Sequence, residues 1–402
     1  MEPVLIGAIY NWEIEMEQSS PVQIITFFLL SLVAVIFLSR YSTQLWGGKP
    51  ETSLEVKQDM VVDMQMSVGQ FGVENQLPKP VLKKVFGLSS RQDLKKTLSS
   101  FAMSEQTLRT KIDQAIVIEA EHTSKNWVKI PLKFSLWFFF LAGVFVLIRK
   151  GDVSPSLRRI LYLVAIFVFG IVLGSDPSPM GTVKDAIALY GAKGVIFKPR
   201  MVALTIFLSL VLLANKFICG WGCQLGTLQD FILRLNRNAK DSGSVLPQFK
   251  PTFLISNSIR TAFFAMFTFS AFYWTVDIVD PIDPFKVFKP AMIGSLGWIF
   301  IVGICITSLF VYRPWCQFFC PFGLVGWLVE KISLFKVTVD YDTCTACKAC
   351  ETVCPSTAME AILRREKSIP DCFSCGTCIN ICPTKSIGFK AVRRRKPPTG
   401  KF

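Results

Sequence analysis

The sequence is poor in histidine and in charged residues. Its 402 residues include one histidine, His122, and only 18% are Asp, Glu, Lys or Arg. A buried b-type haem usually takes two histidine ligands, so we expect no haem, and we interpret His122 as an ordinary surface residue. Hydrophobic residues make up 51% of the chain, and its mean hydropathy is +0.43. These values are unusual for a soluble protein and favour an integral membrane protein.

Acidic residues are also scarce relative to basic ones. The chain has 29 Asp and Glu against 44 Lys and Arg, which gives a formal charge of +15. No nucleic-acid recognition motif accompanies this charge, so we expect no nucleic-acid partner. Lys and Arg concentrated in short loops beside lipid explain the excess more simply.

Several long apolar stretches are candidate membrane spans, because a helix needs about 20 apolar residues to cross the hydrocarbon core. No basic segment with a cleavage site precedes the first stretch, so we interpret it as a retained helix rather than a signal peptide. The candidate spans are Val22–Ser39, Phe134–Ile148, Ile160–Leu173, Met201–Ala214, Thr261–Val276 and Ala291–Tyr312.

The distribution of basic residues predicts the orientation of these spans. Basic stretches follow the second, fourth and sixth spans (RKGDVSPSLRR, LQDFILRLNRNAK, and the segment from RPWC to AVRRRKPPTGKF), so these should share the cytoplasmic side. Both ends of the chain are then cytoplasmic. The N-terminal tail disagrees, since it carries Glu2, Glu13, Glu15 and Glu17 without Lys or Arg, which leaves the direction of the first span open.

The stretch between the first two spans is polar. Residues 41–130 alternate apolar and charged positions at helical spacing, and Ser104 has the character of a helix start. We interpret this stretch as a small helical extramembrane insert without catalytic chemistry. It is either a plain structural insert or a docking element for a partner.

Thirteen cysteines are present, and most are grouped at the spacings of metal ligands rather than scattered as in a disulfide scaffold. Residues 344–355 read CTACKACETVCP and residues 372–383 read CFSCGTCINICP. Each is C-x2-C-x2-C-x3-C-P, the spacing of bacterial ferredoxins that hold two [4Fe–4S] clusters. Zinc knuckles use C-x2-C pairs but not two motifs of this form.

This spacing predicts how the eight thiolates are shared. The first three cysteines of a motif converge on one cluster, and the fourth, followed by Pro, serves the other. One predicted set is Cys344, Cys347, Cys350 and Cys382, and the second is Cys372, Cys375, Cys378 and Cys354. Such a domain transfers single electrons.

Four further cysteines form two C-x3-C hooks, each at the end of an apolar span. CGWGCQLG begins at Cys219 and CQFFCPFG begins at Cys316, and both read C-x3-C-x2-G. This internal repeat indicates two related halves, and a pseudo-symmetric pair of hooks would bring Cys219, Cys223, Cys316 and Cys320 together. They would then hold an additional iron–sulfur cluster. The alternatives are unligated thiols that pack helix ends, a zinc site or a disulfide. Cys305 is interpreted as a core residue.

A multispan chain with two such hooks and a double ferredoxin motif resembles the NapH family of membrane ferredoxins. It is also similar to the C-terminal half of the NosR family and to MauN-type polyferredoxins. The resemblance covers residues 131–390 and implies a carrier that links the quinone pool to a respiratory or maturation partner. In the first hook Gln224 stands where that family has Pro. The insert at 41–130 is not part of the NapH pattern, and the flavin-attachment motif of NosR is absent.

Oxidation of a quinol needs an apolar slot and a base that takes up protons. Acidic residues in the outer loops are weak candidates for this base, and each could equally be a solvated loop residue: Asp176, Asp277, Asp280 and Asp283. Electrons from an outer quinol would need a carrier on the way to the ferredoxin, and a cluster at the hooks would lie on that route. Lys216 and Arg313, just before the hooks, would offset its charge or serve as snorkelling anchors.

The predicted fold is an α-helical integral membrane bundle of about six transmembrane helices with a C-terminal α+β ferredoxin domain of the bacterial double [4Fe–4S] type. The predicted divisions are 1–40 (tail and first transmembrane helix), 41–130 (insert), 131–335 (transmembrane core with the hooks), 336–390 (ferredoxin domain) and 391–402 (basic tail).

We expect a multi-pass protein of the bacterial cytoplasmic (inner) membrane, with the ferredoxin domain in the cytoplasm. It would pass electrons between quinone and other redox subunits or a soluble carrier, as a quinol dehydrogenase or an electron-transfer subunit. The alternative is an accessory factor that supplies electrons for assembling or reactivating a metalloenzyme. A redox-driven pump is a third reading, but no acidic relay within the spans supports it.

Overall fold

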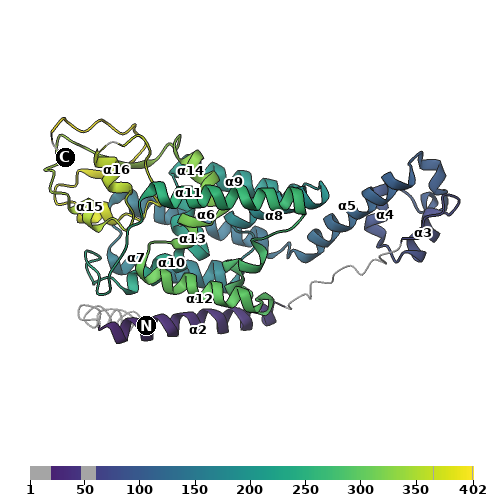
Figure 1. The fold of residues 1–402 in the computed structure, drawn as a ribbon, viewed down its shortest axis with the longest axis horizontal. Helices are drawn as coiled ribbons and strands as arrows, with labels where there is room; N and C mark the ends of the chain where they lie inside the picture. Colours follow the sequence, from purple (N-terminus) through teal and green to yellow (C-terminus); the bar gives the residue numbers. More distant parts are fainter. Residues whose placement is uncertain (1–19, 47–59, 365, 401) are drawn as a thin grey trace.

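A computed structural model describes residues 20–46, 60–364, 366–400 and 402. The chain forms a helical bundle with the cysteine-rich C-terminal region at one end and a small helical module, α3 to α5, at the other (Figure 1). The four glutamates of the N-terminal tail lie outside the described residues.

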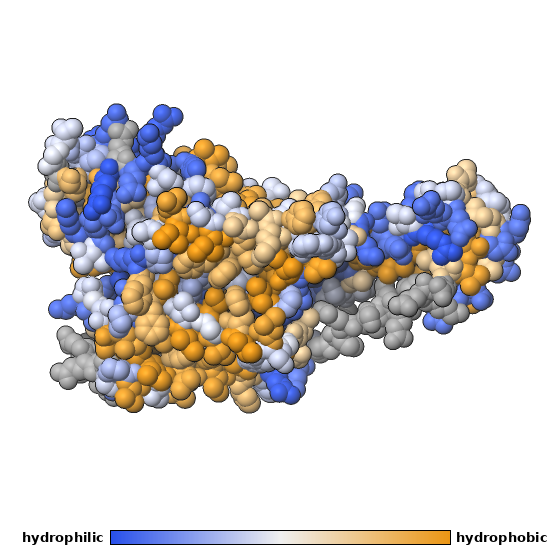
Figure 2. Space-filling view, in the orientation of Figure 1, coloured by the Kyte–Doolittle hydropathy of each residue, from blue (hydrophilic) through white to orange (hydrophobic). Residues whose placement is uncertain are grey.

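Among the described residues, three helices are long and apolar enough to cross a membrane: α2 (Pro21–Leu45), α6 (Lys129–Lys150), and α7 (Pro155–Ala165) with its π-helical continuation η3 (Ile166–Val172). They coincide with the first three predicted spans. Most of the apolar stretch of α2 is not buried inside the protein, and Figure 2 shows hydrophobic residues over the side of the bundle. Such a surface needs lipid around it.

The last three predicted spans coincide with shorter helices. They are α9 (Lys198–Ala214), α11 (Phe253–Phe269) with the π-helical η5 (Ser270–Trp274), and α12 (Ser295–Phe310). Each α-helix here has 16 or 17 residues, so the number of crossings stays a prediction. One helix of the bundle, α8 (Pro179–Lys193), was not predicted from the sequence, because its alternation of apolar and polar residues does not resemble a span.

The insert forms a helical module with its own core. It contains α3 (Val68–Glu74), α4 (Lys79–Phe86), the 3-10 turns η1 (Arg91–Lys95) and η2 (Leu98–Phe101), and α5 (Glu105–Ser124). Ser104 caps α5, as its side chain accepts a hydrogen bond from the Thr107 N–H. The core packs Phe71, Phe86 and Phe101 with aliphatic residues. The module meets the bundle at the far end from the cysteine motifs (Figure 1).

Each hook is a short helical turn that leads into a second helix. The first comprises the π-helical η4 (Ile218–Gly222) and α10 (Gln224–Leu235), and the second comprises α13 (Pro314–Phe318) and α14 (Pro321–Glu330). At the opposite end, three 3-10 turns join α11 to α12: η6 (Asp280–Ile282), η7 (Pro284–Phe288) and η8 (Pro290–Met292).

The cysteine-rich region is a two-stranded sheet with three short helices. Strand β1 (Lys336–Val339) pairs antiparallel with β2 (Ile387–Lys390), and α15 (Ala349–Val353), α16 (Ala358–Arg364) and α17 (Thr377–Ile381) lie between them in sequence. The sheet packs on the bundle through a cluster of aromatic rings: Phe145, Phe217, Phe335 and Phe389. This packing places the ferredoxin motifs against the end of the bundle.

Candidate functional site

The ferredoxin motifs enclose two cavities, each lined by four cysteines. One is lined by Cys344, Cys347, Cys350 and Cys382. The other is lined by Cys354, Cys372, Cys375 and Cys378. The fourth cysteine of each motif therefore faces the cavity of the other motif, in the arrangement that the spacing predicts. Four thiols are the ligand number of a [4Fe–4S] cluster.

The loops around both cavities have a left-handed backbone at equivalent positions. Ala346 and Lys348 have φ of 57° and 58°, and their counterparts Ser374 and Gly376 have φ of 51° and 79°. Alternation of left- and right-handed residues turns successive backbone N–H groups toward one point, which suits a negatively charged group. A side chain at such a position costs about 1 kcal/mol, so Lys348 sits where glycine would be easier.

Burial opposes ionisation of the Cys350 and Cys372 thiols. It raises the pKa of Cys350 and of Cys372 to about 12. Both would keep their protons near neutral pH unless iron displaced them. Hydroxyl groups two residues further along lie 3.5 and 3.6 Å from the sulfurs of Cys375 and Cys354, where they can donate to a thiolate.

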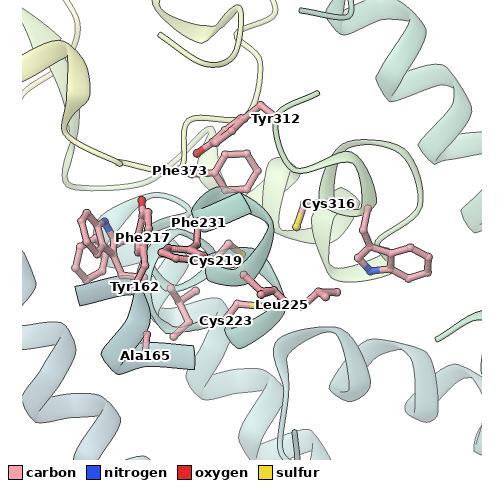
Figure 3. Packing of buried hydrophobic residues seen from close by; sticks show 14 of the residues in the cluster. Tyr162, Ala165, Phe217, Cys219, Cys223, Leu225, Phe231, Tyr312, Cys316 and Phe373 are labelled. Atoms are coloured by element: carbon pink, nitrogen blue, oxygen red, sulfur yellow. The ribbon is translucent and has the colours of Figure 1, made fainter. Parts of the chain in front are cut away.

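The two hooks enclose a third cavity inside the bundle. It is lined by Cys219, Cys223, Cys316 and Cys320, with Trp315, Phe285 and Phe373 among its other walls. Figure 3 shows Cys219, Cys223 and Cys316 deep in the apolar packing. Within the described ranges, no three His, Cys, Asp or Glu side chains are arranged around a single metal ion, and these four thiols instead surround a space.

Each C-x3-C-x2-G motif requires its glycine for a steric reason. A Cβ at Gly226 would lie 2.6 Å from the carbonyl oxygen of Cys219, and one at Gly323 would lie 2.7 Å from that of Cys316. Both distances are shorter than real carbon–oxygen contacts. The glycines therefore let the second helix of each hook approach the first cysteine, and the repeat in the sequence is a repeat in structure.

A cation before each hook reaches across to the other hook. The Lys216 ammonium donates to the Gly323 carbonyl at 2.6 Å, and Arg313 donates to the Gly220 carbonyl at 2.9 Å and to that of Cys219. Both side chains are fully buried, so they are not snorkelling anchors at a membrane surface. They clasp the two halves and bring positive charge close to the four thiols.

Carboxylates hold these cations in place. Asp371 pairs with Lys216 and, at 2.6 Å, with Arg260, whose guanidinium also faces the Cys316 carbonyl. Although burial opposes ionisation, the two cations hold the pKa of Asp371 below its usual value. The group is therefore a carboxylate that fixes the clasp, next to the Cys372 loop.

A second buried network was missed from the sequence. Asp230 of α10 accepts hydrogen bonds from Tyr162 and Tyr312 and pairs with Arg313 at 2.6 Å and with Arg234 at 2.8 Å. The stretch LQDFILRLNRNAK was interpreted as a basic loop, but residues 224–235 form a helix that is buried along its whole length. That stretch therefore gives no support to the predicted orientation.

The second ferredoxin loop is fixed on the bundle by side-chain donors. Asn215 donates to the carbonyl of Cys372, Trp221 to that of Ser374 and Arg158 to that of Cys375, at 2.9 to 3.1 Å. The Phe373 ring lines both this loop's cavity and the hook cavity. One aromatic side chain therefore separates the two groups of thiols.

Replacing Gly220 with Ala is expected to weaken this contact, because the added Cβ would overlap the carbonyl oxygen of Phe373. Overpacking of this kind costs about 1–3 kcal/mol. Thermal unfolding in detergent should therefore show a lower Tm. The matched control is Gly303→Ala in α12, where a Cβ meets nothing within 4 Å. Equal Tm values for the two variants would contradict the close approach.

The four acidic candidates line one polar cavity, which lies on the side of the hooks away from the ferredoxin region. This cavity is lined by Asp176, Asp277, Asp280 and Asp283 together with residues of α5 and α8. Lys184 of α8, which the sequence did not single out, lies 3.3 to 3.5 Å from three of them. The candidates thus share one cavity around a buried cation.

The pKa values of these carboxyl groups differ in direction. Lys289, at 2.6 Å, holds the pKa of Asp176 below its usual range. Lys286 and Lys184 keep that of Asp280 low although burial opposes them. Burial raises the pKa of Asp283, which makes it a better proton acceptor than Asp176 or Asp280. Phe285, two residues on, lines both this cavity and the hook cavity.

Two family matches cover the cysteine motifs. Residues 336–383 match the 4Fe-4S dicluster domain, and residues 199–240 and 293–339 match a family described as a 4Fe-4S binding domain. The second match includes both hooks. The fold, the cysteines and these matches define the class: a membrane protein that transfers electrons through iron–sulfur clusters.

Known relatives refine this class. The chain is 26% identical to the putative electron transport protein YccM of Escherichia coli over 165 residues, or 39% of this chain and 46% of that protein. It is 25% identical to the ferredoxin-type protein NapH of Haemophilus influenzae over 227 residues, or 55% of this chain and 71% of NapH. It is 24% identical to the regulatory protein NosR of Pseudomonas aeruginosa over 161 residues, or 38% of this chain and 22% of NosR.

These similarities, at low identity, support a NapH/NosR-type polyferredoxin, as the resemblance in the sequence indicated. The chain spans about half the length of YccM. No solved structure matches it.

Proposed function

We propose that the protein oxidises quinol at the polar cavity and delivers the electrons to the ferredoxin end. The observation that carries this proposal is the series of cavities. Phe285 separates the polar cavity from the hook cavity, and Phe373 separates the hook cavity from the second ferredoxin cavity. A chain of closely spaced redox sites needs this order, since electrons tunnel only between near neighbours.

The cysteines would hold three clusters. Cys344, Cys347, Cys350 and Cys382 fit the first, Cys354, Cys372, Cys375 and Cys378 the second, and the four hook cysteines a third, because each set lines one cavity. When bound, such clusters accept and release one electron each. Lys216, Arg260 and Arg313 would offset the negative charge of the third within a dry interior.

The residues of the polar cavity would handle the protons. Quinol oxidation releases two protons, and Asp283 would accept the first while Lys184 orients its carboxylate at 3.3 Å. Neighbouring carboxylates at Asp277 and Asp280 offer an exit toward the open side of the cavity, since Asp280 is more than half exposed. Phe285 and Met292 would contact the ring of the quinol.

The proposed orientation follows the exposed cations of the basic loops, which in RKGDVSPSLRR are Arg149 and Lys150, since Arg158 and Arg159 are buried. We propose a multi-pass inner-membrane protein with the ferredoxin end in the cytoplasm. The loop RKGDVSPSLRR lies at that end, because Asn380 of the second ferredoxin motif donates to the Val153 carbonyl. The acidic η6 loop lies at the other end, beside the helical module. This arrangement agrees with the excess of Lys and Arg on cytoplasmic sides.

The test is reduction of the clusters by quinol. Protein in nanodiscs is mixed with a menaquinol analogue, and the iron–sulfur absorbance is followed. Because the pKa of Asp283 lies above its usual value, the rate should increase as the pH rises through that pKa and the group ionises. Asp283→Asn should lower the rate about 100-fold and flatten the pH profile. Asp113→Asn, an exposed position in α5, is the control.

One outcome would favour the accessory role instead. If no quinol bleaches the clusters, and a partner metalloprotein alone changes their spectrum, quinol oxidation is wrong. An Asp283→Asn variant with an unchanged pH profile would remove this residue from the reaction and leave the quinol site to be found elsewhere.

A further inference from the structure

The two ferredoxin cavities have different surroundings. The second faces the bundle, whose side chains hold its loop, and Arg158 lies near the left-handed Gly376. The first faces outward: Cys347 is exposed, whereas every other cysteine within the described residues is at least partly buried. An electron that reaches the first cavity is therefore close to solvent, so this edge is the natural exit or entry for a soluble partner.

Exposed cations surround this edge. Lys348 follows Cys347 directly, and Lys385 follows Cys382 by three residues, with its N–H bonded to the Cys382 carbonyl. Both are exposed, and both have left-handed backbones, with φ of 58° and 51°. In the second motif, the position equivalent to Lys348 is Gly376, and glycine adopts this conformation without strain. The outward motif thus keeps lysine where glycine would be easier, which indicates a use for the charge.

The last residues of the chain bring further cations to the same edge. Phe402 lines the first cavity and packs against Tyr341, with ring centroids 5.7 Å apart. The segment before it carries Arg395, paired with Asp342 at 3.1 Å, and the exposed Lys396. From residue 336 to 402 the sequence has twelve Lys and Arg against six Asp and Glu. Figure 2 shows hydrophilic residues over this end of the molecule.

We propose that the exposed edge of the first cavity is a docking surface for a small acidic protein that carries single electrons. Opposite charge on the two partners would steer the encounter and place the partner's redox centre beside Cys347. A basic surface beside a membrane could instead bind anionic lipid. A protein partner is favoured because the cations are not confined to the segment beside the membrane. Lys348 and Lys385 lie within the loops that carry the cluster cysteines. This inference rests on the proposed electron transfer but not on quinol as the donor.

The test uses two acceptors that differ only in charge. Native cytochrome c is basic, and succinylation of its lysines makes it acidic while the haem stays the same. The protein, in nanodiscs of neutral lipid, is reduced by dithionite, freed of excess reductant, and mixed with either acceptor in a stopped-flow instrument. Each haem takes one electron from the reduced protein. We expect the acidic form to be reduced at least about tenfold faster at low salt, with the preference lost near 0.5 M salt.

Variants separate this surface from overall charge. Lys348→Gly combined with Lys385→Gln and Lys396→Gln should remove most of the preference, and Lys348→Gly should not lower the Tm, since glycine relieves the left-handed backbone. The control removes three exposed lysines at the other end of the molecule, Lys79→Gln, Lys83→Gln and Lys84→Gln, and should keep the preference.

Three results would overturn the proposal. The acceptors could react equally fast, the triple variant could keep the preference, or the preference could vanish in nanodiscs of anionic lipid, which would assign the cations to lipid. Because dithionite supplies the electrons, none of these results depends on quinol. A failure of quinol oxidation in the earlier experiment would in turn leave this preference intact.

Discussion

Replacing Cys219 and Cys316 with Ser is expected to lower the iron content from about twelve atoms per chain to about eight. The variant removes one thiol from each hook, and all four hook thiols line one cavity. A cluster that loses two of four ligands should not survive purification. Iron analysis of anaerobically purified protein, with EPR of the reduced state, measures this loss directly.

The same variant should interrupt electron flow without damaging the ferredoxin end. Dithionite should still reduce the two remaining clusters, whereas a quinol analogue should reduce them at least about 100-fold more slowly, because the intervening site is lost. Cys305→Ser is the control, since this buried cysteine of α12 lines none of the three cysteine cavities. A native protein with only about eight iron atoms would mean that the hook thiols are packing residues.

The grouping of the ferredoxin cysteines around two cavities was predictable because the information is local. Eight cysteines at fixed spacings leave little freedom for their partners, and the two cavities are lined by the predicted sets. The meeting of the hooks was predictable from the internal repeat. The repeated positions of Gly226 and Gly323 were visible in the motif. Their steric role could be recognised only from the backbone of the preceding turn.

The buried charges could not be predicted. Asp230 and Arg313 are 83 positions apart, and a charged residue in an amphipathic helix such as α10 normally faces water. Here α10 packs against α7 and α12 and is buried along its whole length, so its charges find partners inside the protein. The polar cavity was only partly predictable, because the acidic loop residues were visible while Lys184 belongs to a helix that the sequence does not reveal.

A large loss of stability is the second expected result, and it concerns the buried network around Asp230. Asp230→Asn should destabilise the protein by about 3–5 kcal/mol, because it leaves Arg313 buried without its carboxylate and leaves Arg234 with Asp241 alone. The Asp230 side chain is completely buried, so water cannot replace the lost charge. Chemical unfolding followed by tryptophan fluorescence, compared with Asp113→Asn at an exposed site, would measure the loss.

This network also connects stability to the hooks, since Arg313 holds the carbonyls of Cys219 and Gly220 while Asp230 holds Arg313. A freed guanidinium would shift the first hook relative to the second. The Asn variant should therefore lose iron from the hook cavity before the ferredoxin clusters are affected, on warming or on exposure to a chelator. A variant that is destabilised but loses iron from all three cavities together would show that Asp230 stabilises the fold without positioning the hooks.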